Sequence, residues 1–146
     1  MRWRAIPGSA LSLLAIGLGP MSGTPAAASA AGCSWEGCNG LDPQAMGCNG
    51  SSTQTLDTIW PDRGGIKLEL RYSPTCQAVW ARYYNGINGN YGRAEIHGCG
   101  DNWCRIARKT IAGYAGETNW TTMLSWSYRV KACFWWDGFQ DCTAEF

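Results

Sequence analysis

Cysteine is the residue type with the most distinctive chemistry in this chain of 146 residues. The eight cysteines are Cys33, Cys38, Cys48, Cys76, Cys99, Cys104, Cys133 and Cys142. An even set of cysteines in a short exported chain is typical of a disulfide framework, and sequence alone does not choose among the many pairings. We therefore expect four disulfides and no free thiol.

A metal site and a nucleophilic site are the next chemistries to weigh. His97 is the single histidine, and it lies close in sequence to Cys99 and Cys104. Zinc sites usually combine a Cys-x-x-Cys spacing with further Cys or His ligands, whereas four residues separate Cys99 from Cys104. A Cys–His pair needs a free thiol, and no Gly-x-Ser-x-Gly motif surrounds a serine. We therefore predict no metal, no cofactor and no catalytic residue.

Carboxylates provide the enzymatic alternative. Two acids that face each other across a cleft can hydrolyse a glycan. The candidates are Asp42, Glu69, Glu95, Asp101 and Glu117. The sequence does not show which two would face each other, so a cell-wall glycan hydrolase with paired carboxylates stays open as an alternative function.

Aromatic residues are abundant, with nine tryptophans and six tyrosines. Exposed Trp and Tyr are enriched at interaction surfaces, but they also fill the cores of small domains. Apolar neighbours flank Trp80 and Trp126, so we expect both in the core. Trp135 and Trp136 are adjacent on a predicted strand and point to opposite faces. We therefore expect one of them to be partly exposed, and this pair is the predicted binding site.

The first thirty residues have the order of a secretory signal peptide. Arg2 and Arg4 precede an apolar run over residues 5–18, and Ala28-Ser29-Ala30 forms a small-residue cleavage site. A retained membrane anchor would need roughly 20 apolar residues, and no later segment is that long. We therefore expect a signal peptide over residues 1–30 and a single secreted, disulfide-rich β domain over residues 31–146, with no membrane span after cleavage.

Two further classes are weighed against the export prediction. Lipidation of Cys33 is the lipoprotein alternative, but it would leave an odd number of thiols and the apolar run ends well before this cysteine. The formal net charge of the chain is +1. A near-neutral chain without a basic run lacks the electrostatic footprint of a nucleic-acid binder. The partners we expect are a cell-wall glycan or another extracellular protein.

Strand patterns must position these groups. Apolar and charged residues alternate over residues 66–72, which predicts a half-buried strand, and further strands are expected over the ranges 76–84, 91–97, 103–112 and 124–135. For residues 76–84 a short helix capped by Ser73 is the alternative. Turn dipeptides over residues 85–90 predict that the second and third strands form a hairpin. Short strands with frequent turn signals are typical of an all-β sandwich or barrel.

Several motifs resemble those of a known family. They are Cys38-Asn39-Gly40-Leu41-Asp42-Pro43, Gly47-Cys48, Leu70-Arg71-Tyr72-Ser73-Pro74-Thr75-Cys76 and Trp80-Ala81-Arg82. With these motifs the chain resembles the secreted actinobacterial family catalogued as domain of unknown function 2690. The resemblance implies export and a small cysteine-linked domain, and it implies no activity. Cys99, Cys104 and Cys142 depart from the family pattern, which suggests added bridges in the second half.

The charged residues of the strand predicted over residues 66–72 are interpreted as structural. Lys67, Glu69 and Arg71 share its polar face, which predicts a surface charge ladder of weak ion pairs. We therefore expect a non-enzymatic binding or structural module at or outside the cell envelope. A secreted inhibitor or toxin-like protein is a further alternative, since disulfide frameworks present loops rigidly.

Overall fold

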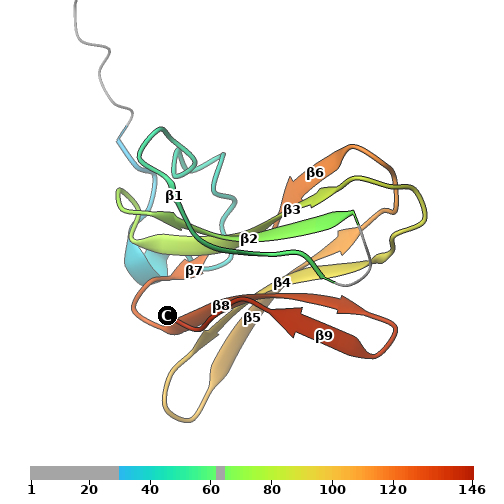
Figure 1. The fold of residues 1–146 in the computed structure, drawn as a ribbon. Helices are drawn as coiled ribbons and strands as arrows, with labels where there is room; N and C mark the ends of the chain where they lie inside the picture. Colours follow the sequence, from blue (N-terminus) through green and yellow to red (C-terminus); the bar gives the residue numbers. More distant parts are fainter. Residues whose placement is uncertain (1–29, 62–64) are drawn as a thin grey trace, which may run out of the picture.

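The computed structural model describes residues 30–61 and 65–146, which form two antiparallel β-sheets that face each other (Figure 1). The first, sheet A, has the strand order β1-β2-β3-β6, with β7 also paired to β3, and the second, sheet B, has the order β5-β4-β8-β9. The elements are η1 (Trp35–Cys38), β1 (Gln54–Ile59), β2 (Ile66–Ser73), β3 (Ala78–Asn85), β4 (Gly92–Cys99), β5 (Cys104–Ile111), β6 (Glu117–Trp120), β7 (Leu124–Ser125), β8 (Arg129–Trp136) and β9 (Phe139–Cys142). The predicted all-β fold is confirmed, in the form of a sandwich.

The main core lies between the two sheets. On β2, Ile66, Leu68 and Leu70 are fully buried, as the alternation predicts. They pack in one cluster with residues of sheet B that include Ile96 and Phe134. Burying a side chain of this size stabilises a fold by about 1.5–3 kcal/mol, so the inner faces hold the sheets together and leave the outer faces for other roles.

The N-terminal segment, residues 31–53, covers part of the outer face of sheet A. A second cluster forms there around Trp80 and Met123, which are 1% and 0% exposed, together with Cys38, Cys48 and Cys76. The predicted core position of Trp80 is confirmed. The outer face of sheet B has no comparable covering segment among the described residues (Figure 1).

All eight cysteines are paired, which confirms the expected disulfide bonds. The bonds are Cys33–Cys38, Cys48–Cys76, Cys99–Cys104 and Cys133–Cys142. The first closes a short loop within the N-terminal segment, the second ties that segment to the β2–β3 turn, and the last two each join paired strands of sheet B. Each covalent link removes conformational entropy from the unfolded chain and so stabilises this small fold.

The predicted hairpin between the second and third strands is wrong. β3 belongs to sheet A and β4 to sheet B, so residues 86–91 carry the chain from one sheet to the other. β3 instead pairs with β2, β6 and β7. Turn dipeptides specify that the chain reverses, but they do not specify which strand becomes its partner.

Other boundaries also differ from the sequence prediction. β1, β6 and β9 were not predicted, and the strand expected over residues 124–135 is divided into β7 and β8. The division falls at Trp126, which is half-buried and packs against the core with its ring centroid 4.7 Å from that of Tyr72. The expected core position of Trp126 therefore holds in part, at the edge of the main cluster.

The export prediction falls mainly on residues that the structure does not describe. Residues 1–29, which make up all but the last position of the predicted signal peptide, lie outside the described ranges. Within those ranges, no helix combines the length and the apolar character needed to cross a bilayer.

Candidate functional site

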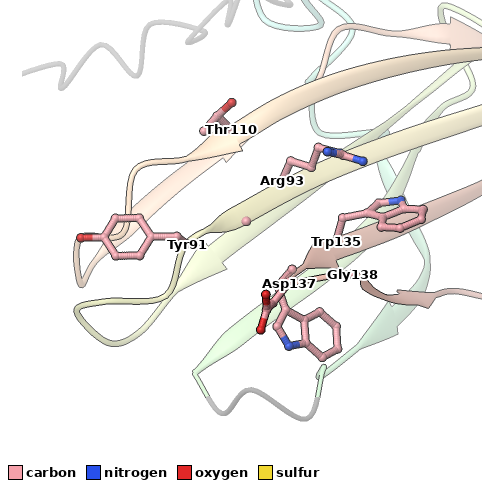
Figure 2. A pocket seen from close by; sticks show the side chains of 8 residues that line it. Tyr91, Arg93, Thr110, Trp135, Asp137 and Gly138 are labelled. Carbon is pink, nitrogen blue, oxygen red and sulfur yellow. The ribbon is translucent and has the colours of Figure 1, made fainter.

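A pocket of about 390 Å³ lies at one end of the outer face of sheet B. Its lining comes from the start of β4, from β5, from the end of β8 and from the turn that follows (Figure 2). The residues are Tyr91, Gly92, Arg93, Thr110, Trp135, Trp136, Asp137 and Gly138. The predicted binding pair, Trp135 and Trp136, is therefore part of the pocket lining.

Strand register brings the central residues together. Arg93 of β4 lies opposite Thr110 of β5 on one side and opposite Trp135 of β8 on the other. Its guanidinium carbon lies 5.1 Å from the Trp135 ring centroid, within the range of a cation–π contact. Figure 2 shows the Arg93 side chain directed toward Trp135. A Cβ atom at Gly92 would lie 2.5 Å from the Trp135 carbonyl oxygen, so this close approach of β4 and β8 requires glycine.

Trp135 and Trp136 point to opposite faces, as expected for neighbours on a strand, and both are half-buried. Trp136 stacks between Phe134 and Phe139, with ring centroids 5.1 and 5.8 Å away, so much of its surface packs against the core edge. Trp135 lies on the outer face, and its indole N–H is buried with no hydrogen-bond partner among the described residues. Trp135 is thus the better candidate of the two for contact with a ligand.

Three residues at the rim of the pocket, Tyr91, Asp137 and Gly138, were missed from the sequence. Tyr91 is 64% exposed, and its ring lies over Gly113, where an added Cβ would come within 2.4 Å of it. Asp137 and Gly138 both have positive φ and form a two-residue hairpin turn between β8 and β9. Asp-Gly is a strong signal for such a turn, so this dipeptide could have revealed both β9 and the rim.

A buried carboxylate borders the pocket. Glu95 is 1% exposed and pairs with three cationic or ionisable neighbours. Arg93 Nε and Arg108 Nε donate to its Oε1 at 2.6 and 2.8 Å, and His97 Nε2 lies 2.7 Å from its Oε2. Burial by itself raises the pKa of Glu95, but the hydrogen bonds from His97, Arg108 and Arg93 outweigh it and hold the pKa below its ordinary value. His97 is therefore engaged with this carboxylate, and Cys99 with Cys104.

The surface charge ladder predicted on β2 is wrong in one respect. Glu69 is only 6% exposed, and Lys67 Nζ, Arg82 Nη2 and Arg71 Nη1 lie 2.9, 2.6 and 3.6 Å from its oxygens. Burial raises the pKa of Glu69, but the hydrogen bond from Lys67 and the charge of Arg82 outweigh it, so the pKa is lowered. The cross-strand Arg82 supplies the extra contact that the pattern of one strand does not reveal.

The other candidate acids also have structural partners or lie apart. Glu117 accepts from the Tyr83 hydroxyl and from the Ala112 backbone N–H. Asp42 accepts from two backbone N–H groups and from Trp120 Nε1 at 2.8 Å. Asp101 is exposed. Each of the five described pockets is lined by at most one carboxylate residue.

Fold and site together define a small disulfide-bonded β-sandwich with an aromatic and charged pocket on one outer face. The chain belongs to the family described as "Protein of unknown function (DUF2690)", whose profile matches residues 36–133. Neither the curated proteins nor the solved structures yield a significant match. The predicted family resemblance is confirmed. Because the function of this family is unknown, a proposed function has to rest on the pocket.

Proposed function

We propose that this protein is a non-enzymatic binding module that acts at or outside the cell envelope. We propose further that it binds a cell-wall glycan in the pocket of sheet B that Trp135 lines, which we call the Trp135 pocket. One observation carries the proposal: aromatic, cationic, anionic and hydroxyl side chains meet in one pocket of about 390 Å³. Sites for small ligands combine apolar surface with a few convergent polar groups and have volumes of roughly 300–1,000 Å³. The four disulfides and the absence of a spanning helix in the described residues are compatible with an extracellular location.

The chemistry of the lining suits a sugar ring. Tyr91 and Trp135 provide apolar faces against which a pyranose C–H surface can pack, and Tyr91 is well exposed. Thr110, Asp137 and the guanidinium of Arg93 provide donors and acceptors for sugar hydroxyls or a carboxylate.

The hydrolase alternative has less support. A glycosidase acid needs a raised pKa so that it is protonated before it protonates the leaving oxygen. The buried carboxylates Glu69 and Glu95 have lowered pKa values and are each held by three neighbours. The Trp135 pocket itself has one acidic residue in its lining, Asp137.

Retention on purified, insoluble cell wall tests the proposed function. We expect the wild-type domain to sediment with the wall and to be released by soluble wall fragments. Trp135→Ala should lower retention about tenfold, which corresponds to roughly 1.4 kcal/mol. Trp103→Ala is the matched control, because Trp103 is 46% exposed and precedes β5 at the opposite end of the same sheet.

Three results would count against the proposal. Absence of wild-type retention would remove wall binding altogether. Equal loss in the Trp103 and Trp135 variants would show that the pocket is not the site. Steady release of reducing ends from the wall by the wild-type protein would establish hydrolysis in place of binding.

A further inference from the structure

The first four cysteines of the chain form a compact cluster. The Sγ atoms of Cys33, Cys38, Cys48 and Cys76 all lie within 4.8 Å of one another. Across the two disulfides, Cys33 Sγ and Cys48 Sγ are 3.9 Å apart. It is the one group of three or more potential metal ligands found among residues 30–61 and 65–146, and the two disulfides of sheet B do not join it.

This spacing has a direct chemical meaning. A tetrahedral zinc site with four thiolates has Zn–S bonds of about 2.3 Å, which places neighbouring sulfur atoms about 3.8 Å apart. The contact between Cys33 and Cys48 already has this separation. Reduction would let the sulfurs within each bonded pair move apart, toward the same distance. We propose that the reduced form of this cluster is a zinc site with four cysteine ligands.

The surrounding chain can hold the sulfurs together without the disulfide bonds. The Trp35 N–H donates to the Cys76 carbonyl at 2.9 Å, and the Cys48 N–H donates to the Pro43 carbonyl at 2.8 Å. The Gly40 N–H also donates to the Met123 carbonyl at 2.9 Å, which ties the segment to the end of sheet A. Packing around Trp80 buries three of the four cysteines. A preorganised site of this kind loses little conformational entropy on metal binding.

The conversion balances with a dithiol as reductant. Each of the two disulfides accepts two electrons and two protons from one dithiol, which becomes a disulfide itself. The four resulting thiols release four protons as they coordinate one Zn²⁺ as thiolates. Cys48–Cys76 links the segment to the β2–β3 turn in the oxidised state, and one metal ion held by all four cysteines would make the same link in the reduced state.

The test uses the full chain after mild reduction with a dithiol in the absence of oxygen. One equivalent of Zn²⁺ is added, small molecules are removed by gel filtration, and bound zinc is measured by elemental analysis. We expect one zinc ion per chain, and a higher melting temperature for the reduced protein with zinc than without it. Co²⁺ in place of zinc should give the strong thiolate charge-transfer absorption of a tetrahedral site.

Paired variants locate the metal. The Cys99→Ser/Cys104→Ser variant lacks two of the four cysteines outside the cluster and should retain one zinc ion, whereas Cys33→Ser/Cys38→Ser should lose it. Should the second variant fail to fold, the cobalt spectrum of the Cys99→Ser/Cys104→Ser variant still decides the ligand set, because its two remaining cysteines outside the cluster are too few for a site with four thiolates. A reduced wild-type chain with less than stoichiometric zinc, or a cobalt spectrum without thiolate bands, overturns the proposal.

Discussion

The outer faces of the two sheets carry the same charged pattern in different surroundings. On each, a buried glutamate lies between two basic or ionisable residues of its own strand and an arginine of the neighbouring strand. The residues are Lys67, Glu69, Arg71 and Arg82 on sheet A and Arg93, Glu95, His97 and Arg108 on sheet B. The two clusters share their charges but differ in what surrounds them, so the surroundings decide the role of each cluster.

The cations differ most in exposure. On sheet A, the side chain of Arg71 is 14% exposed, its Nε is buried without a hydrogen-bond partner among the described residues, and the cluster adjoins the segment that covers Trp80. On sheet B, the side chains of Arg93 and Arg108 are 45% and 54% exposed, and Arg93 extends over Trp135. The first cluster therefore fits a structural role, and the second leaves charge available at a pocket.

The largest effect is expected where covalent links hold the covering segment. Cys48–Cys76 closes a loop with a sequence separation of 28, and Cys99–Cys104 one of 5. Chain entropy predicts that replacing the first pair by serine lowers the free energy of unfolding by about 3.5 kcal/mol, against about 2 kcal/mol for the second. Urea unfolding of the two double serine variants measures both free energies of unfolding. An equal loss in the two variants would contradict the larger stabilisation expected from Cys48–Cys76.

Glu69→Gln is expected to lower the free energy of unfolding by about 3 kcal/mol, the low end of the range for breaking a buried ion pair. The substitution leaves the poorly exposed Arg71 guanidinium without its carboxylate. Chemical denaturation provides the measurement. A smaller loss of unfolding free energy than that of Glu95→Gln on sheet B would contradict the structural role of the sheet A cluster.

That matching variant is Glu95→Gln, with an expected loss of about 1.5 kcal/mol, the lower value for hydrogen bonds to charged groups. Glu95 is the more buried glutamate, but the two arginines that it leaves are about half exposed and regain water. The same denaturation series measures it alongside Glu69→Gln.

The two glutamates also predict a pH dependence. Both have folded-state pKa values below their ordinary value, so the stability that they provide is present above the unfolded pKa of about 4.3 and is lost as the pH falls through the folded pKa. We expect the melting temperature to fall between about pH 5 and pH 2, and to fall less in the Glu69→Gln/Glu95→Gln double variant. Identical acid sensitivity in both proteins would exclude these carboxylates as the cause.

The sequence predicted the inner faces better than the outer ones. Alternation on residues 66–72 identifies Ile66, Leu68 and Leu70 as core, because period two follows from the geometry of one strand. Arg82 beside Glu69, and Arg93 beside Trp135, depend on register between strands, which no single strand encodes. Trp135 could be singled out because it is adjacent to Trp136 on a predicted strand, whereas Tyr91 and Thr110 could not, because they join the pocket only once β4 pairs with β5 and β8.

One matched pair of variants tests wall-glycan binding in the Trp135 pocket most directly. Tyr91 and Tyr114 are 64% and 70% exposed, but only Tyr91 lines the pocket. In a calorimetric titration with soluble wall fragments, Tyr91→Ala should lower the affinity of the protein for the fragments about tenfold. Tyr114→Ala should leave this affinity unchanged. Equal affinities for the two variants would contradict the assignment of this pocket as the binding site.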